Sequence, residues 1–265
     1  MKQSVTTVAF VLAAAAALAA SIICTRYAWD RRGNPNYRVA RWARAFAAVA
    51  GLSATLLSMP ALADRLDLLV GLDDTAMLCS HLSTVMCCTG LQIMMVDWMY
   101  SSRYLIGGVL TRIAAALAAS GLLIVQFHQV NHAKFDFTTS YAVSHRVTTY
   151  LLTFLLFVAY AAIEGTSLCI GMALASFRQG RRRSGAAEAT VALGSAFAFT
   201  YAALKITYLA SFHLGGPTPK AEQAITSPMI ALAATLTLAG LSAMLIGKQA
   251  HRADPPRSAA PAQAN

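Results

Sequence analysis

The residues of this chain best suited to chemistry are a few ionisable side chains within long apolar runs. Arg112 and Glu164 each lie about eight residues from the boundary expected on the same side of a membrane, roughly 12 Å at the α-helical rise. Because their depths match, we predict that they form one ion pair. A buried pair can fix the packing of two helices, or it can serve in gating or proton transfer. The sequence leaves both roles open.

His81 and Lys205 form a second group, nearer the opposite boundary. Both lie roughly 8 to 10 Å below it by the same helical rise, and Tyr201 and Tyr208 belong to the same run as Lys205. These four side chains predict a polar cavity that opens outward and meets an anionic ligand at Lys205. The alternative is a Lys205 that faces lipid and extends its ammonium group to the interface.

The segment QFHQVNHAKFDF spaces His128, His132 and Asp136 four residues apart. They share one face if the preceding helix continues outward, and such a face is a weak candidate for metal binding or for a charge change near pH 6.5. His145 and His213 also fall beside the expected outer loops. Two histidines four residues apart are not specific, so we predict no bound metal.

Motifs for catalysis or cofactor binding are absent from the sequence. It contains no GxSxG, no HExxH and no phosphate-binding glycine loop. The five cysteines all lie within apolar runs and form no CxxC pair, which argues against a disulfide framework or a structural zinc site. We therefore expect neither an enzyme nor a cofactor.

Long apolar runs must position all of these side chains. The 265 residues are 57% hydrophobic and 12% charged, whereas soluble domains are about 25% charged. A helix that crosses about 30 Å of hydrocarbon needs roughly 20 apolar residues. Seven runs meet that need: Val5 to Cys24, Ala45 to Ala63, Thr75 to Val96, Tyr104 to Phe127, Val147 to Phe177, Ala189 to Phe212 and Gln223 to Gly247.

This pattern predicts an all-α, polytopic membrane protein. Residues 1–247 form a single bundle of about seven transmembrane helices, and residues 248–265 form a disordered cytoplasmic tail. Small residues are expected to let the helices approach closely. The candidates for these contacts are Gly107, Gly108, Ala161, Gly165 and Gly240.

The basic residues indicate an orientation in the membrane. An N-terminus outside places 14 Lys and Arg residues on the cytoplasmic side and five on the outer side, as the positive-inside rule requires. The first run has features of a cleavable signal peptide, but cleavage would leave the arginines between positions 26 and 44 outside. We therefore expect a multi-pass protein of the cell membrane with its C-terminus in the cytoplasm. Four aspartates make the second outer loop an acidic, solvated rim: Asp64, Asp67, Asp73 and Asp74.

The net charge of +10 does not indicate nucleic acid, because it lies in short clusters between apolar runs and forms no basic groove. The expected partners are the lipid bilayer and a cytoplasmic protein that binds the arginine-rich inner loops.

Part of the chain resembles a known family. Asn34-Pro35 precedes the second run, ALADRLDLLVGLDDTAMLCSHLSTV leads into the third, and His81 lies within that third run. In these features Asn34 to Leu91 resembles a family of actinobacterial integral membrane proteins labelled as transporters. The resemblance implies seven helices and transport of a small solute.

Two functions remain compatible with the sequence. One is a transporter of a small solute or ion, favoured by the resemblance and by the scattered intramembrane charges. The other is a membrane sensor or receptor-like module that signals through a separate cytoplasmic partner, favoured by the odd number of helices and the outer histidines.

Overall fold

The computed structural model describes residues 2–34, 37–71, 74–100, 102–131, 142, 144–215 and 222–253. Helices account for nearly all of them, and these ranges contain no strand. The helices are α1 (Lys2–Asp30), α2 (Arg38–Leu57), α3 (Pro60–Val70), α4 (Thr75–Met99), α5 (Ser102–Asn131), α6 (His145–Arg178), α7 (Arg182–His213) and α8 (Glu222–Ala253).

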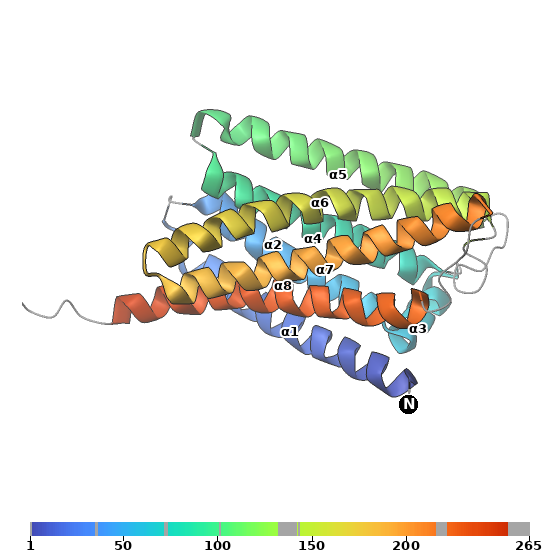
Figure 1. The fold of residues 1–265 in the computed structure, drawn as a ribbon, viewed down its shortest axis with the longest axis horizontal. Helices are drawn as coiled ribbons and strands as arrows, with labels where there is room; N and C mark the ends of the chain where they lie inside the picture. The colour runs from blue at the N-terminus through green and yellow to red at the C-terminus, as the bar shows by residue number, and fades with distance from the viewer. Residues whose placement is uncertain are drawn as a thin grey trace, which may run out of the picture.

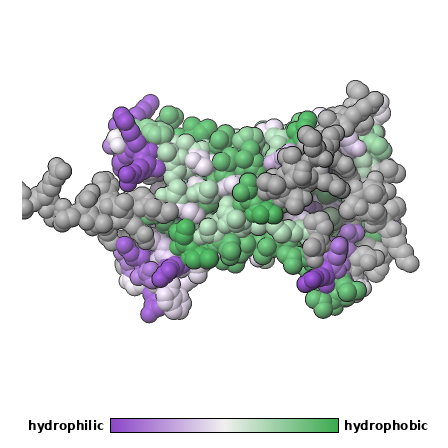
Figure 2. All heavy atoms as spheres, turned by 90° about the horizontal axis from the view of Figure 1, so that it is seen from below, coloured by the Kyte–Doolittle hydropathy of each residue, from purple (hydrophilic) through white to green (hydrophobic). Residues whose placement is uncertain are grey.

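The helices form a membrane bundle. Six of those in the described residues are long and apolar enough to cross a bilayer, and the count reaches seven if α2 and α3 together make one bent span. Figure 2 shows hydrophobic side chains around the middle of the molecule and hydrophilic ones at its ends. The prediction of an all-α, polytopic membrane protein is confirmed.

The two ends of the bundle differ in their residues. The connections α1–α2, α4–α5 and α6–α7 meet at one end, where the last turns of α8 also lie (Figure 1). We call this the arginine end, because Arg31, Arg41 and Arg181 lie there. The start of α1, the whole of α3 and residues His145 and His213 lie at the other end, which we call the histidine end.

The second expected span ends earlier than predicted. Instead of one run from Ala45 to Ala63, α2 ends at Leu57 and the chain turns by 88° into α3. The cause is Pro60, which lacks an N–H and disfavours helical geometry in the residue before it. Met59 accordingly adopts an extended conformation, with φ −85° and ψ 123°.

Part of the acidic rim is therefore helical. Asp64 and Asp67 lie in α3, where Asp64 is exposed and Asp67 is half-buried, whereas Asp74 lies in the turn before α4. The Asp67 carboxylate accepts a hydrogen bond of 2.7 Å from the backbone N–H of Ala76, in the first turn of α4. It thus satisfies one of the unpaired N–H groups at a helix start and complements the helix dipole. Asp73 lies outside the described residues.

Asp97 plays the same role at the arginine end. The third run was expected to end at Val96, but α4 continues to Met99 and includes Asp97. Its carboxylate accepts a 2.8 Å hydrogen bond from the backbone N–H of Ala40, in the first turn of α2. This contact joins α4 to the start of α2 and places a negative charge where the helix dipole favours it.

α8 also extends past its expected end at Gly247 and continues to Ala253. The first part of the expected tail is therefore helical, and residues 254–265 lie outside the described residues.

α5 lies at the edge of the bundle. Among the described residues it packs only against α4 and α6 (Figure 1). Large apolar side chains on its outer surface are exposed, for example Ile106, Leu110 and Leu117. In a membrane bundle this surface faces lipid.

Small residues make the closest helix contacts, as predicted, with one exception. Gly108, Ala161, Gly165 and Gly240 are buried at helix contacts, whereas Gly107 is exposed and has no neighbour that an added Cβ would meet. The reason is the rotation of α5, which turns Gly108 toward Val96 of α4 and Gly107 away from it.

Gly194 makes the tightest of these contacts, between α7 and α8. A Cβ at this position would lie 2.4 Å from Oγ1 and 2.7 Å from the backbone nitrogen of Thr237. We expect Gly194→Ala to lower the free energy of unfolding by about 1 to 3 kcal/mol, because the two helices must separate. Thermal unfolding in detergent micelles measures the loss.

Gly171 provides the matched control for this substitution. It lies in α6, is exposed, and would meet nothing within 4 Å. Gly171→Ala should leave the protein unchanged or stabilise it by up to about 1 kcal/mol through helix propensity. Equal effects of the two substitutions would contradict the close α7–α8 contact.

Candidate functional site

A cavity of about 370 Å³ lies in the centre of the bundle. Side chains of α1, α2, α4, α6, α7 and α8 line it, while α5 contributes none. Its wall extends from Ser58, Lys205 and Thr226 near the histidine end to Met94 and Gly165 deep among the helices. We call it the central cavity.

His81, Tyr201 and Lys205 all line the central cavity, so the structure brings together three of the four residues expected there. Tyr208 does not line it. It lies one helical turn beyond Lys205, toward the histidine end, and packs against the hydrophobic cluster around Leu209 and Tyr150. Depth alone therefore does not decide which side chains face the cavity.

The ring of His81 is held in a defined orientation. Its Nδ1 shares a hydrogen bond of 2.8 Å with the hydroxyl of Tyr150, and its face stacks on Phe154 with 4.0 Å between ring centroids. Tyr150 is completely buried in α6. No spacing or motif in the sequence distinguishes Tyr150 from the other tyrosines of the apolar runs.

Most of the wall of the central cavity is apolar, with hydroxyl groups near the histidine end. Ser58 and Ser80 are 2.9 Å apart at their Oγ atoms, and both hydroxyls also reach the carbonyl oxygen of Ala54, at 2.8 and 3.0 Å. A cavity with apolar walls and a single lysine suits a small solute with an apolar body and one anionic group.

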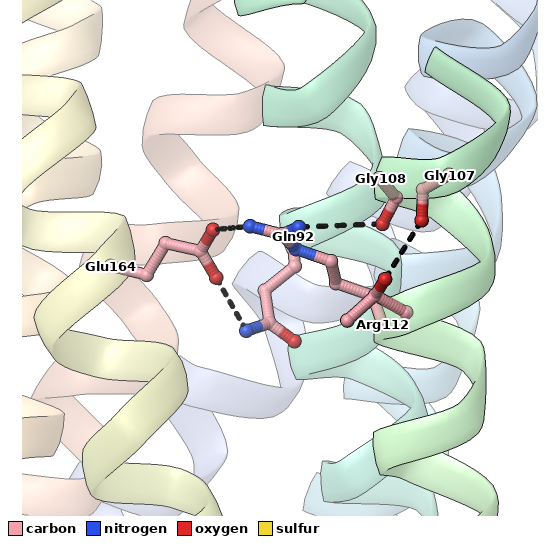
Figure 3. Close-up of polar contacts among 6 residues, drawn as sticks. Gln92, Gly107, Gly108, Arg112 and Glu164 are labelled. Atoms are coloured by element: carbon pink, nitrogen blue, oxygen red, sulfur yellow. Dashed lines mark hydrogen bonds and ion pairs between the residues drawn. The ribbon is translucent and has the colours of Figure 1, made fainter. Parts of the chain in front are cut away.

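Arg112 and Glu164 form an ion pair between α5 and α6 (Figure 3). The second carboxylate oxygen of Glu164 accepts a 2.7 Å hydrogen bond from Nε2 of Gln92, a fully buried residue of α4. Arg112 also donates to the carbonyl oxygen of Gly108, at 3.4 Å. None of these three side chains lines the central cavity. Their geometry suits a structural role, which is to attach the peripheral α5 to α4 and α6.

Gln92 is a site residue that the sequence analysis missed. The sequence feature that could have identified it is an amide side chain inside an apolar run. In a membrane, an unsatisfied polar group at such a position costs several kilocalories per mole. Both oxygens of Glu164 are hydrogen-bonded because Gln92 is present.

A second cavity, of about 620 Å³, lies at the arginine end, and we call it the arginine cavity. Its wall includes Arg31, Arg41, Arg44 and Arg181 together with Glu188. The sequence analysis assigned these arginines to membrane orientation and to the binding of a cytoplasmic protein partner, not to a cavity. Hydropathy places them near the end of the bundle but does not show which of them point inward.

The two cavities are separated by one contact layer. Met94 lines the central cavity and Arg44 lines the arginine cavity. Nε of Arg44 donates to the sulfur of Met94 at 3.3 Å, and the guanidinium lies 5.1 Å from the centre of the Trp98 ring. Met94, Arg44 and Trp98, which we call the septum, thus lie where the walls of the two cavities meet.

Only one of the three weak candidates for metal binding lies within the described residues. His128 is exposed at the end of α5, while His132 and Asp136 lie outside the described residues. The rings of His145 and His213 stack with 4.6 Å between centroids, and Nε2 of His213 shares a 2.9 Å hydrogen bond with Thr148. Within the part of the chain that the structure describes, no three potential ligands are close enough to hold a metal ion.

In comparisons with known proteins, no family model matches this chain, and neither a curated protein nor a solved structure matches it significantly.

Proposed function

We propose that this protein is a transporter of a small solute that carries an anionic group. The observation that supports it best is the pair of cavities, one toward each end of the bundle, with the septum of Met94, Arg44 and Trp98 between them. A carrier exposes a central site to one side of the membrane at a time, and two cavities whose walls meet at a few contacting side chains fit one state of such a cycle.

The proposed location is the cell membrane, with the N-terminus outside and the C-terminus in the cytoplasm. The distribution of Lys and Arg supports this orientation, because the arginine end then faces the cytoplasm. The resemblance of Asn34 to Leu91 to transporter-labelled membrane proteins supports the same class of function.

The second candidate function is a membrane sensor that acts through a cytoplasmic protein partner. The stacked rings of His145 and His213 at the histidine end favour it. The arginine end would then bind the partner.

Chemical labelling of Cys87 distinguishes the two functions. Cys87 lines the central cavity, and it becomes a single reporter when Cys24, Cys79, Cys88 and Cys169 are replaced with alanine. For a transporter, we expect a membrane-impermeant methanethiosulfonate to modify Cys87 both in right-side-out and in inside-out vesicles. The cavity must open to each side in turn for this to occur.

Two control variants complete the labelling experiment. Leu117→Cys, on the lipid-facing surface of α5, should react from neither side. Ser184→Cys, in the arginine cavity, should react in inside-out vesicles if the proposed orientation is correct. Modification of Cys87 from one side only would overturn the transporter proposal and favour the sensor.

A further inference from the structure

The central cavity is long and narrow. Its wall extends from Ser80 to Met95 on α4 and from Val191 to Lys205 on α7, so the cavity spans roughly 20 Å at the α-helical rise. Its volume over that length is only about 370 Å³. These dimensions suit an extended chain better than a compact solute.

The chemistry of the wall changes along the cavity. Its basic side chains, Lys205 and His81, both lie near the histidine end. The wall beyond them is mostly apolar, although Ser195 and Thr237 add two hydroxyl groups. The large apolar side chains of this deeper wall are Leu91, Met94, Met95, Val158, Val191 and Leu238. The cavity therefore suits a molecule with a charged group at one end and a hydrocarbon chain behind it.

Four hydroxyl groups near the basic side chains donate to the protein itself. Ser58 and Ser80 both direct their hydroxyls to the carbonyl oxygen of Ala54. Thr55 and Thr84 each donate to a carbonyl oxygen one turn earlier in the same helix. A hydroxyl has a single hydrogen to donate. An anionic group at this end of the cavity therefore depends chiefly on nitrogen donors.

His81 is held so that one ring nitrogen remains for a solute. Its Nδ1 shares the 2.8 Å hydrogen bond with the Tyr150 hydroxyl, and its ring stacks on Phe154. Among the described residues the ring makes no other hydrogen bond, and it is only partly buried. A Tyr150 hydroxyl that donates to Nδ1 leaves the imidazole hydrogen on Nε2, where it can bind an anion.

We propose that the central cavity binds an unbranched monocarboxylate, with its carboxylate at Nζ of Lys205 and Nε2 of His81 and its hydrocarbon chain extended toward Met94. The two carboxylate oxygens match these two kinds of nitrogen donor, and the ammonium group of Lys205 supplies the positive charge. Tyr150 is a positioning residue, because it determines which nitrogen of His81 carries the hydrogen. This inference rests on the proposed function, since it names the class of solute that the transporter carries.

A photoreactive fatty acid tests where the chain lies. The full-length protein in phosphatidylcholine nanodiscs is irradiated with a dodecanoic acid that carries a diazirine group near its terminal methyl, and the modified peptides are identified by mass spectrometry. We expect modification within residues 87–95 of α4 and 230–238 of α8, and unlabelled dodecanoate should suppress it. Modification of the lipid-facing surface of α5, by probe dissolved in the bilayer, should not be suppressed.

Competitors with the same chain identify the charged group. Dodecanol carries no charge and dodecylamine carries the opposite charge. At the concentration where dodecanoate suppresses the modification of the cavity, neither of the two should do so.

Variants assign the carboxylate to His81. Tyr150→Phe keeps the ring but removes the hydroxyl, and we expect it to weaken competition by dodecanoate about tenfold while the positions of modification stay the same. His81→Gln, which retains an N–H donor, should compete better than His81→Phe. Tyr160→Phe is the matched control, because Tyr160 is an exposed residue of the same helix and does not line the cavity.

Two results would overturn the proposal. One is modification that never reaches the cavity segments of α4 and α8. The other is suppression by dodecanol that equals suppression by dodecanoate, because the cavity would then bind the chain without its charge. Labelling of Cys87 gives a separate answer: if Cys87 reacts from both sides while dodecanoate has no effect, transport stands and the monocarboxylate is the wrong class of solute.

Discussion

Replacing Glu164 with leucine is expected to destabilise the folded bundle by about 3 to 5 kcal/mol, because it leaves the Arg112 guanidinium without its carboxylate. Replacing Arg112 with leucine should cost a similar amount, since Glu164 then keeps only its hydrogen bond from Gln92. Both changes together remove both charges, so the double variant should recover much of the loss. Thermal or denaturant unfolding in micelles of fixed composition measures all three variants.

Thr111→Val is the matched control for this cycle. Thr111 is the neighbour of Arg112 on α5, is exposed, and donates only to the carbonyl oxygen of Gly107 within its own helix. Its replacement should change stability by less than about 0.5 kcal/mol. Losses that add fully in the double variant would show that Arg112 and Glu164 act independently.

Lys205 is expected to determine which charged reagents reach the central cavity. With Cys87 as the single reporter, an anionic methanethiosulfonate should react about tenfold faster at low salt than a cationic one of similar size, because a charged cavity concentrates the opposite charge. Lys205→Gln should remove this preference, and Lys205→Arg should keep it. The ratio of the two modification rates is the measurement.

Arg65→Gln is the control for the Lys205 experiment. Arg65 is an exposed residue of α3 at the same end of the bundle and does not line the cavity. Its loss should leave the ratio of rates unchanged. If Lys205→Gln also leaves the ratio unchanged, the ammonium group has no effect on the cavity, and the lipid-facing alternative becomes the better explanation.

The sequence predicts the helices well because a membrane imposes one strong requirement, which is about 20 apolar residues in each span. Hydropathy does not define where a helix ends. The predicted run from Ala45 to Ala63 therefore joined α2 to the start of α3 across Pro60, where hydropathy stays high but the backbone cannot continue as a helix. The prediction also ended the third run at Val96, although Asp97 still lies within α4.

In the candidate site, the sequence predicts the depth of a side chain in the membrane but not the direction in which it points. The rise of an α-helix converts sequence position into depth, and equal depth correctly brought together Arg112 with Glu164 and His81 with Lys205. Depth does not specify rotation about the helix axis, which depends on all the neighbouring helices. For that reason Tyr208 was placed in the cavity, whereas the inward direction of Arg41 and Arg44 was not foreseen.

The position of α5 at the edge of the bundle also bears on how the protein is made. Helices leave the ribosome in order, so α5 enters the bilayer before α6 has been synthesised. Gln92 on α4 is then already available, but Glu164 is not, and Arg112 has no carboxylate partner. A lone arginine near the centre of a membrane helix costs about 2.5 to 3.5 kcal/mol at insertion. α5 offsets this cost with the most apolar sequence of the candidate spans among the described residues, and its final attachment to the bundle waits for α6.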